Sequence, residues 1–212
     1  MNETPTPALG SRRAAARLFG LRDGAVNVGV ARQRLAEAAL GHVLELGGDN
    51  GANLFLYPRT ITSLTSLLTS RKLNPGVRRS SRQLSFPVDR RTGSLSVFPL
   101  KDRAYDTVVS TFALSTTPTL SETLEEIRRV LKIGGRLLFL EYGLSAEEGV
   151  ARWQRRCAPL HRLVSGARQP LHFIDQEIIH AGFALKHVQR EYLERLPRAL
   201  GCVYEGVAFN GD

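Results

Sequence analysis

Apolar residues recur with two different periods in the middle of the chain. Leu137 to Leu140 form an unbroken apolar run, which is typical of a strand covered on both faces. The residues before this run place apolar side chains on one face of a helix, namely Leu120, Leu124, Ile127 and Leu131. Between the two, Gly134 and Gly135 allow the chain to leave a helix. The pattern predicts a helix, a turn and a buried parallel strand.

The start of this helix carries a capping signal. Thr119 and Glu122 have the spacing of a capping box, in which each side chain hydrogen-bonds the other residue's backbone N–H. We therefore expect the helix to begin at Thr119.

The same alternation of strands and helices extends over the whole chain. Apolar runs between breakers predict strands at 42–46, 60–65, 83–88, 105–112, 137–141, 184–193 and 202–209. Helical patterns cover 27–40, a short stretch ending at 57, 66–73, 119–131 and 175–181. Strands that alternate with helices predict an α/β fold with a mostly parallel sheet and helices on both faces.

Length and composition are those of one globular domain of the larger kind. The 212 residues suffice for one buried core, and we divide them into an N-terminal helical segment, 1–40, and a domain, 41–212. No apolar run approaches the roughly 18 residues of a membrane-spanning helix. Cys157 and Cys202 lie far apart and outside any metal-binding spacing, so we expect free thiols, a reducing compartment and no metal.

Basic residues are unevenly distributed. The chain has 29 Lys and Arg against 20 Asp and Glu, a net charge of +9. Segment 71–103 holds nine basic residues and two acids, and segment 152–168 holds five arginines and no acid. Such clusters favour RNA, a ribonucleoprotein or an anionic membrane surface as partner. The alternative is a solvated surface that keeps the protein soluble.

The N-terminal residues allow two interpretations. Ala8 to Gly20 carries Arg12, Arg13 and Arg17 on an alanine-rich stretch, which resembles an organelle-import leader. This interpretation places the protein in mitochondria. An ordinary N-terminal helix is the alternative, with a cytoplasmic, intracellular protein.

A glycine-rich loop follows the first predicted strand. In open α/β sheets ligands bind beyond the carboxyl ends of the strands, which places residues 45–53 at the site. Gly47 and Gly51 let the backbone approach a ligand closely, and the next helical turn offers free amides to an anion. The Gly47-Gly48-x-x-Gly51 spacing does not match the dinucleotide-binding fingerprint.

Three segments together resemble a known family. Residues 45–53, 98–111 and 125–135 are similar, in order, to class I S-adenosylmethionine (SAM)-dependent methyltransferases of the type 11 group. This group includes small methyltransferase-like proteins that methylate lipids, quinones or thiols. The resemblance runs from about residue 42 to 209. It implies a Rossmann-like, seven-stranded, mostly parallel sheet whose last strand is antiparallel.

The resemblance also implies a cofactor site. Glu45 would organise the loop, and Ser110 and Thr111 would border SAM. Thr65 stands for the acid that binds the ribose hydroxyls, and Asp89 for the acid after the third strand. The loop residues around the methionine moiety of SAM would be Gly47, Gly48, Asn50 and Gly51.

Departures from the family pattern affect both ends of this site. Asp49 stands where the pattern has a glycine, adding bulk and negative charge beside the SAM carboxylate. The Thr65 hydroxyl makes fewer hydrogen bonds than a carboxylate, so SAM affinity should fall. Asp89 matches the family's acid after the third strand only if residues 90–96 are an insertion relative to the family pattern.

Two functions remain open. The first is transfer of a methyl group from SAM to an oxygen, nitrogen or sulfur nucleophile of a small-molecule, lipid-like or RNA acceptor. The second is a catalytically degenerate methyltransferase fold that serves as a basic RNA-binding or ribonucleoprotein assembly factor. Candidates for a catalytic base lie at or beyond the fifth strand: Glu141, Tyr142, His161 and His172. Their alternative roles are a loop-capping carboxylate for Glu141 and surface or lid residues for the histidines.

Overall fold

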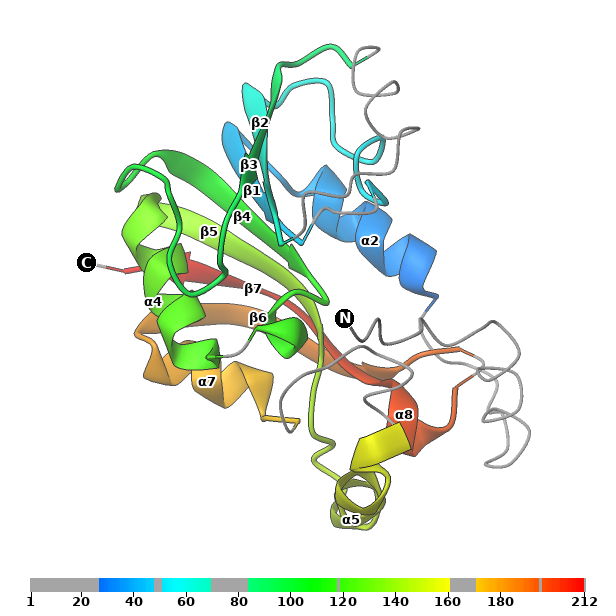
Figure 1. The fold of residues 1–212 in the computed structure, drawn as a ribbon. Helices are drawn as coiled ribbons and strands as arrows, with labels where there is room; N and C mark the ends of the chain where they lie inside the picture. Colours follow the sequence, from blue (N-terminus) through cyan, green and yellow to red (C-terminus); the bar gives the residue numbers. More distant parts are fainter. Residues whose placement is uncertain are drawn as a thin grey trace, which may run out of the picture.

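A single seven-stranded sheet forms the centre of the computed structural model, which describes residues 27–47, 51–69, 84–117, 119–160, 171–194 and 196–211 (Figure 1). The strand order is β3-β2-β1-β4-β5-β7-β6. The strands are β1 (His42–Leu46), β2 (Ser63–Leu68), β3 (Val88–Thr92), β4 (Tyr105–Thr111), β5 (Leu131–Tyr142), β6 (Phe183–Tyr192) and β7 (Cys202–Asn210). Strands β1 to β5 pair in parallel, and β7 lies antiparallel between β5 and β6. The predicted mostly parallel sheet with an antiparallel last strand is confirmed.

Helices cover both faces of this sheet. They are α2 (Val28–Glu37), α4 (Leu120–Val130), α5 (Glu148–Arg156), α7 (Ile174–His180) and α8 (Arg198–Gly201), with a 3-10 turn, η3 (Leu114–Thr116). Helix α2 packs into one hydrophobic cluster, whereas α4 and α7 pack into another across the sheet (Figure 1). Successive residues of β5 alternate between them, with Leu137 and Phe139 in one and Leu138 and Leu140 in the other. Burial on both sides explains the unbroken apolar run.

Helix starts follow the sequence signals in part. The Asn27 side chain accepts hydrogen bonds from the backbone N–H groups of Gly29 and Val30 and so caps α2. Thr119 is the N-cap of α4, as expected, but its hydroxyl donates to the Glu122 carboxylate and makes no capping bond to the backbone. The predicted reciprocal capping box is therefore wrong in its hydrogen bonding.

Several element boundaries on the β2–β3 side of the sheet are shifted. Strand β2 runs three residues beyond the predicted end at Thr65, so residues 66–68 belong to a strand and not to the predicted helix. Strand β3 begins where the third strand was predicted to end, because β2 pairs with 88–92. Residues 52–56 form turns and not a helix. The pairing of β2 with β1 and of β3 with β2 sets these boundaries, and the local sequence pattern does not specify them.

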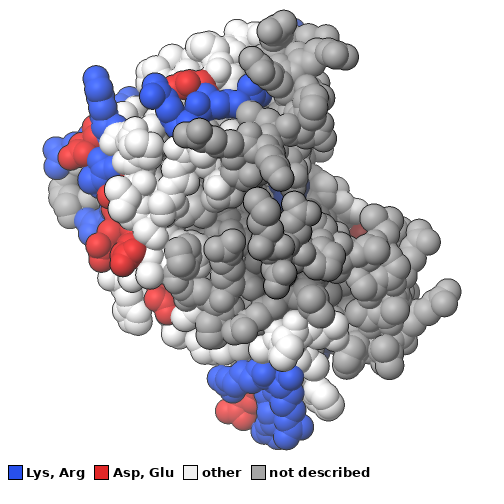
Figure 2. Space-filling view, viewed as in Figure 1, with Lys and Arg blue, Asp and Glu red and all other residues white. Residues whose placement is uncertain are grey.

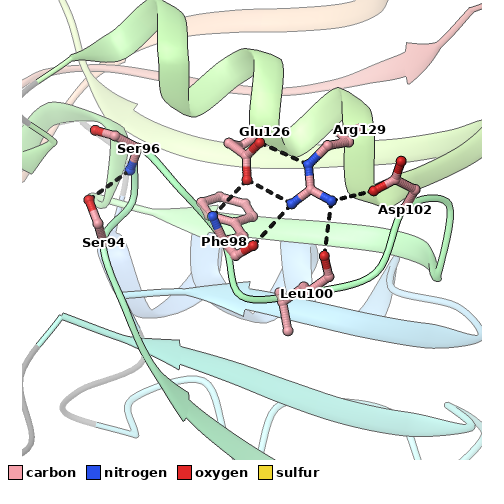
Figure 3. Close-up of polar contacts among 7 residues, drawn as sticks. All are labelled: Ser94, Ser96, Phe98, Leu100, Asp102, Glu126 and Arg129. Carbon is pink, nitrogen blue, oxygen red and sulfur yellow. Dashed lines mark hydrogen bonds and ion pairs between the residues drawn. The ribbon is translucent and has the colours of Figure 1, made fainter.

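An arginine of α4 holds the loop that leads into β4. Arg129 hydrogen-bonds both Glu126 oxygens at 2.8 Å and the carbonyls of Phe98 and Leu100 at 3.0 and 2.9 Å, and pairs with Asp102 (Figure 3). The Phe98 N–H in turn donates to Glu126 at 2.6 Å. We call this group the Arg129 cluster. It fixes the entrance of β4, the strand that carries Ser110 and Thr111 at its other end.

Some predictions fall on residues that the structure does not describe. The arginine-bearing stretch 8–20 and the basic residues between 71 and 83 lie outside the described residues. Helix α2, which lies within the predicted N-terminal segment 1–40, packs into the hydrophobic cluster that also contains residues of β1, β4 and β5. The division of the chain at residue 40 stays a prediction. No helix in the described ranges has the length and apolar character needed to cross a membrane.

Candidate functional site

The carboxyl ends of β1, β4 and β5 form one polar edge of the sheet. Glu45 is the penultimate residue of β1, and Thr111 is the last residue of β4. Glu141 and Tyr142 end β5. Strand β1 pairs with β2 on one side and β4 on the other, so the chain reverses its winding direction there. A crevice at such a switch point is where open α/β sheets bind ligands.

The loop after β1 has the backbone conformation that the glycines predict. Gly47 and Gly51 have φ angles of 70° and 61°, in the region that favours glycine. A Cβ added at Gly47 would lie 3.1 Å from the Ala113 Cβ. Gly48, Asp49 and Asn50 lie outside the described residues. The described part of the loop therefore places bare backbone at the end of β1.

Glu45 is buried beneath this loop. Its carboxylate accepts a long hydrogen bond, 3.4 Å, from the Ser66 hydroxyl of the neighbouring strand. Burial raises the pKa of Glu45, and hydrogen bonding to Asn53 and the charge of Arg32 oppose the rise. The position suits a residue that organises the loop from below.

Two residues that sequence reasoning missed join this site. The Asn53 side-chain amide donates to Thr111 Oγ1 at 3.1 Å and accepts from Arg32 Nη1 at 2.8 Å. Arg32 comes from α2, and its guanidinium carbon lies 5.5 Å from the centre of the Phe112 ring. Desolvation lowers the pKa of Arg32, although nearby Glu45 opposes this. One cation therefore reaches the carboxyl edge from a helix that precedes β1.

An aromatic pair borders the same edge. The Phe112 and Tyr142 rings have centres 4.6 Å apart, and Arg32 lies over the Phe112 ring, so the predicted Tyr142 belongs to the same group of side chains as Arg32. Phe112 has a φ angle of 55°, which is uncommon for a residue other than glycine. Such strained backbone is often stored at functional sites. We call Arg32, Asn53, Thr111, Phe112 and Tyr142 the Arg32 cluster.

Glu141 is a loop cap in this structure. Its side chain is fully buried and accepts hydrogen bonds from the Ser110 hydroxyl at 2.7 Å and from three backbone N–H groups at 2.9 to 3.2 Å. Those N–H groups belong to residues 113–115, at the start of η3. Burial raises the pKa of Glu141 to about 7, although these hydrogen bonds oppose the rise. Both oxygens are occupied, which favours the loop-capping role over proton transfer and commits Ser110 to the same bond.

Thr65 and Asp89 lie away from the carboxyl edge. Thr65 is buried inside β2, three residues before the strand ends at Leu68. Asp89 lies next to Thr65 on β3, where its half-exposed carboxylate pairs with Arg91 at 2.7 Å. Within 63–69 and 88–93 Asp89 is the only acid, so the carboxyl ends of β2 and β3 present none.

His172 lies beside the chain that leaves β5. Its carbonyl accepts a hydrogen bond from Leu144 N at 2.8 Å, and its Nδ1 lies 3.3 Å from Glu177 Oε1. Its Nε2 is buried without a partner among the described residues. His161 lies outside them. In the described ranges no three His, Cys, Asp or Glu side chains gather as metal ligands, and both cysteines are free.

Comparison with known proteins gives partial matches to methyltransferases. Residues 44–139 match the family model described as a methyltransferase domain, type 11. The ubiquinone/menaquinone biosynthesis C-methyltransferase UbiE of Rubrivivax gelatinosus is 41% identical over 59 residues, 28% of this chain and 24% of that protein. A phthiotriol/phenolphthiotriol dimycocerosates methyltransferase of Mycobacterium ulcerans is 30% identical over 143 residues, 66% of this chain and 48% of that protein. The chain thus matches less than half the length of these relatives.

Solved structures share the fold at low identity. A putative methyltransferase of Bacillus halodurans has a TM-score of 0.63 at 18% identity, covering 77% of this chain and 71% of that one. The cyclase SpnF has a TM-score of 0.69 at 18% identity, covering 91% and 86%. A cyclase among them shows that the fold alone does not decide the reaction. The family model and the sheet topology agree: residues 44–139, just under half of the chain, match the type 11 methyltransferase-domain family, and the chain has the fold of class I SAM-dependent methyltransferases.

Proposed function

We propose that this protein is a SAM-dependent methyltransferase that acts on a small, lipid-like acceptor. The observation that carries the proposal is the carboxyl edge of β1, where Glu45 lies under a loop with positive φ angles at Gly47 and Gly51. The names of relatives support the acceptor class, since they specify ubiquinone or menaquinone biosynthesis and phthiotriol dimycocerosates.

The residues present fit the amino-acid half of SAM better than the nucleoside half. The backbone at Gly47 and Gly51 would lie against the methionine moiety, and Arg32 brings a positive charge toward its carboxylate. The ribose side has no acid at the ends of β2 and β3, so we expect weak binding. When bound, SAM supplies an activated methyl group on a sulfonium.

The protein would contribute alignment, exclusion of water and a proton acceptor. His172 is our candidate for that acceptor, because the Glu177 carboxylate beside Nδ1 orients the ring and leaves Nε2 to take the acceptor's proton. His172→Gln should leave the SAM dissociation constant unchanged and lower kcat by about a hundredfold. Equal kcat values for variant and wild type would exclude this role.

Calorimetric titration with SAM and with its demethylated product tests the binding site. Gly47→Ala forces a side chain into a positive-φ position and brings its Cβ within 3.1 Å of Ala113, so SAM affinity should fall at least about tenfold. Gly134→Ala is the matched control. Gly134 has a φ angle of 73° and no atom within 4 Å of an added Cβ, and it lies at the opposite end of β5.

Three results would separate the hypotheses. Weakened binding by Gly47→Ala alone supports the proposal. Equal losses in both variants would show a global stability effect and contradict this placement of the site. If folded wild-type protein binds neither ligand at millimolar concentration, the second candidate, a degenerate fold acting as a binding module, takes its place. The specific observation in favour of that candidate is the acid-free edge of β2 and β3.

A further inference from the structure

The outward face of α5 is cationic and contains an exposed tryptophan. Arg152, Trp153, Arg155 and Arg156 are all exposed, and Trp153 keeps 54% of its surface accessible. Figure 2 shows these basic side chains gathered on α5, at the bottom of the view. At 100° per helical residue the four side chains spread over about 160° of the helix circumference. Ala151 and Gln154 lie on the other side and are buried.

The three arginines of this face lack acidic partners. Within the described part of the chain none of them forms an ion pair, and Arg156 instead lies over the Trp153 ring at 5.7 Å. Glu147, the acid just before α5, is already paired with Arg198. Glu148, the first residue of α5, is exposed on the same arc of the helix, so three arginines and one glutamate leave a net charge of +2 around a half-exposed aromatic ring.

The buried side of α5 ties the helix to the strand that borders the site. Gln154 accepts a hydrogen bond from Ser145 N at 2.7 Å and donates to the Gly143 carbonyl at 3.0 Å. Both partners lie within three residues of the end of β5. A Cβ at Gly143 would fall 2.3 Å from the Tyr204 ring, so this stretch is closely packed. The outward face is thus held at a fixed place next to the carboxyl edge.

We propose that the outward face of α5 docks on an anionic lipid bilayer. A tryptophan suits the boundary between headgroups and acyl chains, because its ring is apolar and its N–H is polar. Arginines beside it lay their aliphatic stems on the apolar region and keep the guanidinium at the phosphates. The outward face thus offers both interactions of interfacial binding, electrostatic attraction to anionic lipids and burial of an apolar ring, while the other side of α5 packs on the protein.

Single-stranded RNA is the competing partner, since it also contacts arginines and stacks on aromatic rings. The single aromatic ring favours the bilayer, because RNA-binding faces stack successive bases on several aromatics. Docking itself does not depend on methyl transfer. Its consequence, delivery of an apolar acceptor from the bilayer to the adjacent site, rests on the proposed function.

Trp153 is the only tryptophan of the chain, so its fluorescence reports directly on the face. The full-length protein is mixed with vesicles of phosphatidylcholine alone or of phosphatidylcholine and phosphatidylserine in equal parts. We expect co-sedimentation and a blue shift of Trp153 emission with the anionic vesicles only. Absence of both would overturn the proposal whether or not the protein binds SAM, and SAM titration of the same sample keeps the two questions separate.

Charge-matched variants test the location. The triple substitution Arg152→Glu, Arg155→Glu and Arg156→Glu should weaken vesicle binding by about a hundredfold. The control reverses three exposed basic residues elsewhere, Arg59→Glu, Lys101→Glu and Lys186→Glu, with the same change in net charge. Equal weakening by both triples would show a diffuse effect of net charge and refute an α5 site.

Two further measurements complete the test. Trp153→Ala should weaken binding while the circular dichroism spectrum and melting temperature stay those of wild type, because the side chain is exposed. Polyuridine should leave vesicle binding and Trp153 emission unchanged. Quenching by polyuridine together with release from the vesicles would assign the face to RNA instead.

Discussion

Two buried carboxylates at the carboxyl ends of β1 and β5, the strands on either side of β4, have different surroundings. Glu45 lies beneath the glycine loop, where Ser66 donates a long hydrogen bond, and hydrogen bonding to Asn53 and Tyr57 and the charge of Arg32 oppose the rise in its pKa that burial causes. Glu141 accepts one hydrogen bond from the Ser110 hydroxyl of β4 and three from backbone N–H groups of the turn after β4. The same residue type therefore suits a ligand loop in one place and caps a turn in the other.

Glu141 should impose a pH dependence on stability. Burial raises its pKa to about 7, so between its ordinary pKa of 4.5 and pH 7 the folded state holds a proton that the unfolded chain has released. The free energy of unfolding should therefore fall as pH rises through this window, by on the order of 3 kcal/mol, and level off above it. Urea denaturation between pH 5 and 8 measures the effect.

The variant Glu141→Gln isolates this contribution. Gln cannot titrate, and its amide nitrogen faces backbone N–H donors, so the variant should be less stable at every pH and lack the slope. The gap to wild type should be widest near pH 5. Glu125→Gln, an exposed change on α4, is the control. A constant gap between Glu141→Gln and wild type would contradict the raised pKa.

The missing acid at the end of β2 predicts a gain of function. Thr69 directly follows β2 and is exposed. If SAM binds at this edge, Thr69→Asp supplies a carboxylate for the ribose hydroxyls and should tighten SAM binding by about tenfold or more. Thr69→Asn, of nearly equal shape and no charge, is the comparison in calorimetry. No improvement by Asp over Asn would place the ribose elsewhere.

At the scale of elements, the Arg129 cluster joins α4 to the loop that enters β4. Arg129→Lys keeps the charge but loses the planar set of donors that reaches two carbonyls and two carboxylates (Figure 3). We expect the free energy of unfolding to fall by about 2 kcal/mol in chemical denaturation. Arg155→Lys on the exposed face of α5 should change it little.

The same cluster has a pH signature. The hydrogen bonds from Arg129 lower the pKa of Glu126, so their stabilisation is present at neutral pH and is lost as pH falls through the lowered value. The difference between Arg129→Lys and wild type should therefore shrink in acid. A difference that stays constant down to the acid transition would mean that packing, and not the ion pair, carries the effect.

Elements also show where prediction from sequence succeeds. Strands 42–46 and 105–111 and helix 120–130 were found because each has a strong local period and clear breakers. The β2–β3 side was misplaced by three to five residues. The register of β2 comes from pairing with β1 and that of β3 from pairing with β2, each more than a dozen residues away in the sequence, and no local signal specifies either register.

At the scale of the whole molecule, the arginines fall into two groups with different surroundings. Arg32 and Arg129 are part-buried and hydrogen-bonded, whereas the arginines of α5 are exposed and form no ion pair within the described part of the chain. Net charge alone favoured any polyanion. Once these two groups are separated, the positive face of α5 supports the proposed lipid surface beside the proposed methyl-transfer site.

The sequence by itself determined the fold class, the order of most elements and the glycine loop after β1, because local periods, breakers and motifs encode them. Only the tertiary structure decided which side chains meet. Arg32, Asn53 and Phe112 converge from three separate segments, while Thr65 and Asp89 lie away from the edge where the family pattern put them. The physical reason is that contacts between distant segments depend on strand register and helix packing, which no short stretch of sequence specifies.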